Sequence, residues 1–174
     1  MLTIQLPHKV KFICGFIFSQ NSIYKKAKNI LEDSFGKIDF ESKEIDFNGT
    51  AYYEKETGKD LKRRFISFKK LRAPSSFAAI KLFSIGIEKK FALNSKRKIN
   101  IDPGYLNEAK LVLTTTKDFA HRIYLKQGVF AEVTLSFNNG KYRHFPTTFP
   151  DYRTEAQKNI FHSIRKIYRE QLRK

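Results

Sequence analysis

The chain has 174 residues, of which 41% are hydrophobic and 29% charged, a composition that excludes an intrinsically disordered protein and fits one domain of roughly 100–200 residues. The single cysteine, Cys14, excludes an internal disulfide and a cysteine zinc cluster. The longest apolar stretch, Phe12 to Phe18, is far shorter than the ~20 residues that span a bilayer, and no signal-peptide pattern is present. We therefore expect one cytoplasmic domain over residues 1–174 without a membrane partner.

The charge balance is strongly basic, with 34 Lys and Arg against 17 Asp and Glu and a formal net charge of +17. Such an excess favours anionic partners such as nucleic acid or phosphorylated ligands. The alternative is a solvated basic surface without a dedicated partner. The basic residues are spread along the chain, with modest concentrations at 59–72, 89–98 and 153–174.

The first half of the chain predicts alternating strands and helices. The apolar run from Val10 to Phe18 is typical of a strand covered on both faces. Apolar residues at helical spacing then predict a helix that ends at Gly36 in a left-handed conformation. A strand or hairpin is expected over 37–47 and a polar loop over 48–60. A strand over 64–71 and a helix over 74–94, which starts at a proline, are expected to follow.

A strand after Lys98 completes the order β-α-β-β-α-β, which predicts a ferredoxin-like core with a mostly antiparallel sheet over about residues 8–116. Residues 110–116 could be its last strand, or 107–113 a short helix, because a short apolar run does not decide between them. A β-meander and a final helix from about Thr154 are expected over 117–174. The predicted class is therefore α+β.

A hairpin in the last third suggests a reactive pair. A two-residue turn at Gln127-Gly128 with regular pairing places Ile123 opposite Glu132, so that His121 becomes a diagonal neighbour of Glu132 on the same face. A carboxylate beside a histidine fixes the imidazole tautomer and raises its basicity, which suits proton transfer. The alternative is a hydrogen-bonded strand histidine next to a surface glutamate.

These patterns define the candidate site. The predicted catalytic residues are His121 as the acid or base, Glu132 as its orienting partner, and Asp118. Cations beside such a pair are typical of a phosphate or carboxylate site. The predicted ligand-binding residues are Lys117, Arg122, Arg64, Tyr124 and Arg153.

Two aspartates have simpler local explanations. Asp102-Pro103-Gly104 is typical of a turn, in which Asp102 caps the chain, although it could instead bind a metal or orient a base. Asp151 follows Pro150 and is explained by capping of the final helix. The sequence has no P-loop and no dinucleotide-binding glycine motif, and its four histidines are too scattered to indicate a multi-histidine metal site. Residues 63–68 lack the glycine of an RNA-binding sheet motif.

Several motifs together resemble one family over nearly the whole chain. They are Tyr52-Tyr53-Glu54, Leu61 to Phe65, Asn100 to Leu106, Ala109 to Leu113, Thr115 to Asp118, His121 to Leu125, Ala131 to Leu135 and Pro150 to Arg153. The chain resembles DUF4416, a bacterial family of small uncharacterised proteins, some of which are labelled GTP-binding. The polar character of these motifs implies a ligand site.

We predict from these observations a protein that binds or acts on an anionic, phosphate-bearing small ligand of nucleotide-like character. The alternative is a nucleic-acid-binding module that uses the basic surface, and a third reading is an adaptor that contacts other proteins. The sequence leaves open whether the protein is an enzyme, which cofactor it uses and its oligomeric state.

Overall fold

The computed structural model describes residues 3–47 and 60–173. The expected polar loop with Tyr52, Tyr53 and Glu54 lies outside the described residues. The α-helices are α1 (Asn21–Phe35), α3 (Phe77–Lys90) and α4 (Glu155–Leu172), with short 3-10 helices η1 (Pro74–Ser76) and η2 (Pro150–Arg153). The strands are β1 (Lys11–Phe18), β2 (Ile38–Glu41), β3 (Ile45–Asp46), β4 (Lys62–Phe68), β5 (Ile99–Leu106), β6 (Lys110–Thr115), β7 (Ile123–Lys126), β8 (Val129–Asn138) and β9 (Lys141–His144).

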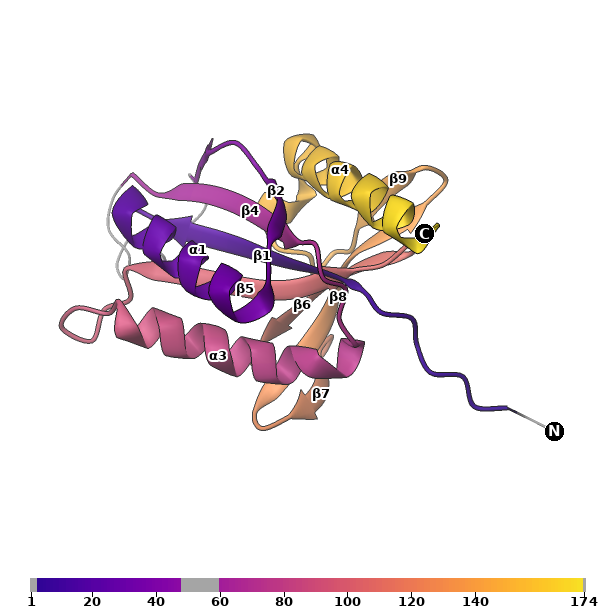
Figure 1. Ribbon diagram of the computed structural model, residues 1–174, viewed down its shortest axis with the longest axis horizontal. Coiled ribbons are helices and arrows are strands. Elements are labelled where there is room, and N and C mark those ends of the chain that lie inside the picture. The colour runs from indigo at the N-terminus through magenta and orange to yellow at the C-terminus, as the bar shows by residue number, and fades with distance from the viewer. Residues whose placement is uncertain (1–2, 48–59, 174) are drawn as a thin grey trace.

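The strands form one nine-stranded sheet in the order β2-β4-β1-β5-β6-β8-β7, with β3 paired to β4 and β9 to β8 (Figure 1). Every strand pair among the described residues is antiparallel. The predicted α+β class with a mostly antiparallel sheet is therefore confirmed. Residues 110–115 form a strand, which decides against the short helix.

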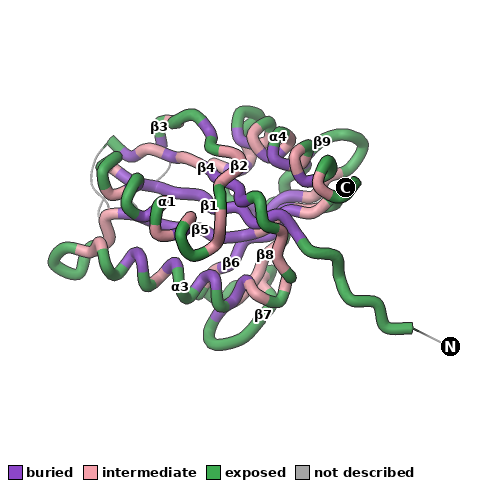
Figure 2. The backbone as a smooth tube through the Cα atoms, in the orientation of Figure 1, coloured by how far each residue is buried: buried purple, intermediate pink, exposed green. Residues whose placement is uncertain are grey.

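Helices cover both faces of the sheet. The helices α1 and α3 pack on one face, against a core that includes Phe12, Phe16 and Phe18 of β1, while α4 and η2 pack on the other (Figure 1). All eight residues of β1 are buried (Figure 2), as the continuous apolar run predicted. None of the helices formed by residues 3–47 and 60–173 is long and apolar enough to cross a membrane.

The Asp102-Pro103-Gly104 sequence is not a turn, contrary to the local prediction. It lies inside β5, where Asp102 pairs with Gly15 and Pro103 with Cys14 of β1. On the other side, β5 pairs with β6 only from Gly104 to Leu106. Proline has no N–H to give to a ladder, so the pairing with β6 stops beside Pro103, and the two strands separate beyond it.

The hairpin turn predicted at Gln127-Gly128 forms, and a second one forms at Asn139-Gly140, but the predicted register of the first hairpin does not. The turns have positive φ at Gln127 and Gly128 and at Asn139 and Gly140, as two-residue hairpin turns require. Lys126 pairs with Val129, but an irregularity after Tyr124 shifts the strand, so that Ile123 lies opposite Ala131 instead of Glu132. The predicted regular pairing of the first hairpin was therefore wrong.

The ends of the helices differ from the local predictions in two places. Gly36 has a positive φ of 95°, but its ψ of 175° is extended rather than left-handed helical. The N-cap of α4 is Thr154, whose side chain accepts a hydrogen bond from the backbone N–H of Gln157. Asp151 therefore does not cap the final helix.

Candidate functional site

A cleft with a volume of ≈ 330 Å³ opens where β5 and β6 separate. Asn100 and Asp102 of β5 line one side, and 113–116 at the end of β6 line another. The volume lies at the lower end of the range for small-molecule sites, about 300–1,000 Å³. The described residues that line it include five cationic side chains, Arg63, Lys81, Arg97, Lys117 and Arg122, and three carboxylates, Asp102, Glu132 and Asp151.

Arg63 is the buried centre of this cleft. Its side chain is 1% exposed, and its guanidinium carbon lies 4.8 Å from the ring centre of Phe65 and 4.9 Å from that of Tyr152. One guanidinium nitrogen lies 3.3 Å from the carboxylate of Asp151, and the other lies 3.7 Å from that of Asp102. Two carboxylates thus share this cation in a poorly solvated place, where a lone charge would be very costly.

Burial affects the acidity of Asp151. Desolvation raises the pKa of the Asp151 carboxyl above its ordinary value, although the positive charge of Arg63 opposes this shift. The negative charge of Asp102 raises the pKa further. Arg63 is therefore the main group that opposes the rise in the pKa of Asp151.

Two side chains from α3 fill the gap that β6 leaves beside β5. Lys81 donates a hydrogen bond to the backbone carbonyl of Ile101 (3.0 Å), and Glu88 accepts one from the backbone N–H of Ile101 (2.6 Å). In a regular sheet, the backbone of a neighbouring strand would form these hydrogen bonds with the N–H and C=O of Ile101. Lys81 also lies 3.8 Å from Asp102, and burial raises the pKa of Glu88 while Lys81 opposes that rise.

Arg122 organises the loop over residues 117–122 at another side of the cleft. Its Nε donates to a carboxylate oxygen of Glu132 (2.7 Å), and its Nη1 donates to the backbone carbonyl of Lys117 (2.9 Å). The guanidinium also lies over the ring of Phe119, 4.6 Å from its centre. Arg122 therefore holds the backbone that carries Lys117, itself a cleft residue.

The structure brings His121 and Glu132 together, but by a route the sequence did not predict. The His121 Nε2 lies 3.2 Å from the same Glu132 oxygen that Arg122 binds. His121 belongs to the turn before β7 rather than to a strand. The contact arises because this turn folds back toward β8. One carboxylate oxygen of Glu132 therefore contacts both Arg122 and His121.

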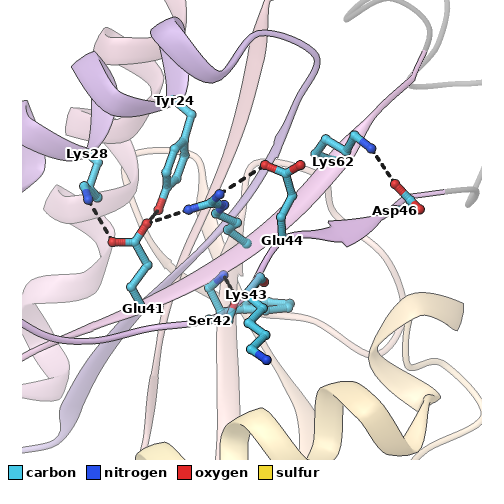
Figure 3. A network of polar contacts seen from close by, with 10 residues as sticks. Tyr24, Lys28, Glu41, Ser42, Lys43, Glu44, Asp46 and Lys62 are labelled. Atoms are coloured by element: carbon cyan, nitrogen blue, oxygen red, sulfur yellow. Dashed lines mark hydrogen bonds and ion pairs between the residues drawn. The ribbon is translucent and has the colours of Figure 1, made fainter.

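The other predicted site residues lie apart from the cleft or play a different part. Arg64 binds Glu41 (2.9 Å) and Glu44 (3.1 Å) beside Tyr24, on the opposite face of β4 from Arg63. Figure 3 labels these three partners, Glu41, Glu44 and Tyr24. Strand alternation explains this separation from Arg63. The structure therefore does not bring Arg64 together with the cleft residues.

Three further predicted residues do not line the cleft. Tyr124 is 58% exposed on β7 and packs against Phe130. Arg153 donates to the backbone carbonyls of Thr148 and Pro146 and so stabilises the approach to α4. Asp118 is exposed.

Asp102, which the sequence suggested as a metal ligand, lines the cleft among cationic side chains. Its nearest charged partners are the cations Arg63 and Lys81, and it accepts a hydrogen bond from the Asn100 amide (2.8 Å). Within residues 3–47 and 60–173, no group of three or more His, Cys, Asp and Glu side chains is arranged to hold a metal ion.

Sequence reasoning missed Arg63, Lys81, Arg97, Asn100 and Asp151 as cleft residues. One signal was available for Arg63. Arg63 stands two positions before Phe65, with one residue between them, so both side chains must lie on the same face of β4, and Phe65 is a core residue. For Lys81, on a helix of the opposite layer, no local pattern points to the cleft.

Replacing Glu132 by glutamine is expected to loosen the 117–122 loop. The change removes a charged hydrogen bond to Arg122, whose loss costs about 1.5 kcal/mol, and local opening should become roughly tenfold more frequent. Trypsin cleavage after Lys117 or Arg122, followed by mass spectrometry, measures this opening. The control Glu155→Gln removes an exposed ion pair to Lys158 and should leave cleavage of this loop unchanged. Equal cleavage of wild type and Glu132→Gln would contradict the role of Arg122.

The sequence was also compared with known proteins. The family described as "Domain of unknown function (DUF4416)" matches residues 8–168. Neither the curated proteins nor the solved structures contain a match. The match spans nearly the whole chain and agrees with the resemblance seen in its motifs, so the protein is a member of the DUF4416 family.

Proposed function

We propose that the cleft between β5 and β6 binds a compact anionic ligand that carries a phosphate group. The observation that carries the proposal is the excess of cations in the cleft, five against three carboxylates among the described residues. Cationic side chains form short, charge-assisted hydrogen bonds with phosphate oxygens. The hydroxyl groups of Thr115 and Thr116, which also line the cleft, add neutral donors, whereas the Thr114 hydroxyl donates to the backbone carbonyl of Pro103.

In this proposal Lys117, Arg122 and Arg97 contact the anionic group. Arg122 is held in advance by Glu132 and by the backbone of Lys117, so that little side-chain entropy is lost when the ligand binds. Glu132 acts as a positioning residue for Arg122. His121, which touches Glu132, is the proposed acid or base of any reaction at this site.

Pyrophosphate is expected to stabilise the protein against thermal unfolding. A ligand at 100 times its Kd stabilises the folded state by about 2.7 kcal/mol, which for a chain of this size raises Tm by roughly 5–10 °C. The variant Lys117→Met should bind pyrophosphate at least about tenfold more weakly, because it loses a charged contact. The control Lys126→Met, exposed on β7, should bind like the wild type.

A failure of pyrophosphate, phosphate and phosphate monoesters to raise Tm would overturn the proposal. So would equal affinity of the wild type and Lys117→Met. Binding of DNA or RNA that falls steeply with salt, and that Lys117→Met does not alter, would favour the second candidate function. This is nucleic-acid binding by the basic surface, which the net charge of +17 and the exposed Lys166 and Arg173 of the α4 region support.

We also propose a ferredoxin-like unit for the first part of this fold. The elements β1, α1, β2, β4, α3 and β5 follow one another in the β-α-β-β-α-β order, with the short β3 added. Their spatial strand order, β2-β4-β1-β5, supports the assignment, and the remaining strands and α4 extend the same sheet in what we propose is a single domain.

A further inference from the structure

Asp151 lines the cleft, and both of its carboxylate oxygens are buried without a well-aligned side-chain donor among the described residues, although the backbone N–H groups of Asp151 and Tyr152 act on the carboxylate and lower its pKa. Its side chain is only 10% exposed, and its ion pair with Arg63 spans 3.3 Å. A carboxylate can accept several hydrogen bonds, and a buried acceptor without a donor is unfavourable. A donor on the ligand would remove this deficit.

The charges around Asp151 indicate what kind of donor would suit it. Asp102 and Asp151 contribute two negative charges to this part of the cleft, and Arg63 and Lys81 contribute two positive ones. An ammonium group would meet the repulsion of two cations there and would gain no net attraction. A hydroxyl group loses less hydration on entry and can still donate to the carboxylate. The local balance therefore favours a neutral donor.

We infer that the ligand is a hydroxylated phosphate ester, of the polyol phosphate or sugar phosphate class, with one hydroxyl group that donates to Asp151. This inference rests on the proposed function, because the phosphate group takes the contacts of Lys117 and Arg122. The phosphate group and the hydroxyl group of the ligand then contact different residues of the cleft, Lys117 and Arg122 in one case and Asp151 in the other. The volume of ≈ 330 Å³ suits a ligand of this compact size.

The test compares four small probes by calorimetric titration of the full chain. Glycerol 1-phosphate and ribose 5-phosphate carry hydroxyl groups, ethyl phosphate carries none, and phosphoethanolamine carries an ammonium group. We expect the hydroxylated esters to bind roughly tenfold or more tightly than ethyl phosphate, as the loss of a hydrogen bond to a charged group predicts. We expect phosphoethanolamine to bind no more tightly than ethyl phosphate.

The variant Asp151→Asn keeps the shape of the side chain and removes its charge. We expect its preference for glycerol 1-phosphate over ethyl phosphate to fall below about threefold, with folding checked by the unfolding transition. The ranking of probes by the wild type tests the inference even if this variant does not fold.

Two kinds of failure can be told apart. Equal affinity for ethyl phosphate and glycerol 1-phosphate, or tighter binding of phosphoethanolamine, would overturn the inference while phosphate binding stands. An unchanged preference in a folded Asp151→Asn would also overturn it. If pyrophosphate and all four esters fail to bind, the proposed function fails and the inference falls with it.

Discussion

Replacing Arg63 by methionine is expected to lower the free energy of unfolding by about 3–5 kcal/mol, because removal of one partner leaves buried charge uncompensated. Arg63 is 1% exposed and is the cation next to both Asp102 and Asp151. Methionine keeps much of the apolar contact with Phe65 and Tyr152, so the loss reports mainly the charge. Since native domains are stable by only 5–15 kcal/mol, urea unfolding should show a clearly lowered midpoint.

The neighbouring residue provides a matched control. Arg64→Met removes ion pairs to Glu41 and Glu44 on the opposite face, where the Arg64 side chain is 24% exposed, so we expect a loss of about 1 kcal/mol. Adding Asp151→Asn to Arg63→Met should recover part of the lost stability, because it removes one of the uncompensated carboxylates. Equal losses for Arg63→Met and Arg64→Met would contradict the buried role of Arg63.

Replacing Gly104 by alanine is expected to destabilise the protein by about 3 kcal/mol, at the upper end of the cost of overpacking. A Cβ atom at this position would lie 2.3 Å from the backbone carbonyl oxygen of Val112 and 2.8 Å from a methyl group of Leu113. Both lie on β6, so relief of the clash requires the two strands to move apart where their pairing is already short. Thermal unfolding measures the loss.

Gly86 in α3 gives the opposite expectation from the same substitution. No atom lies within 4 Å of a Cβ built on it, and it is exposed in the middle of the helix. Gly86→Ala should therefore stabilise the protein by about 0.5–1 kcal/mol through the lower entropy of the unfolded chain. If Gly104→Ala proved as stable as the wild type, the close approach of β5 and β6 would not be a constraint on the fold.

Much of the fold could be predicted from the sequence because its signals are local. The buried strand β1, the helices and the two hairpin turns follow from apolar spacing and from turn residues. The irregular register of β7 could not be predicted, since nothing in the residues around Tyr124 reveals a shift. The Asp102-Pro103-Gly104 turn was a wrong prediction, because tertiary pairing with β1 outweighed the turn preference of these residues.

The candidate site was predicted only in part, for a related reason. His121, Glu132, Lys117 and Arg122 lie in or beside one hairpin, so their proximity could be predicted, although the regular register from which it was argued does not form. The other half of the cleft comes from β4, α3, β5 and η2, and depends on long-range packing. Asp151 is an example. From the sequence, capping of the final helix was enough to explain it, but the structure shows that Thr154 is the cap.

The hydrogen bonds of Lys81 and Glu88 to Ile101 tie the width of the cleft to the position of a helix. In most sheets the spacing of neighbouring strands is set by the strands themselves. Here the wall that carries Asn100 and Asp102 is fastened to α3 instead. Substitutions on the buried side of α3 can therefore reshape the cleft without altering any residue that faces it.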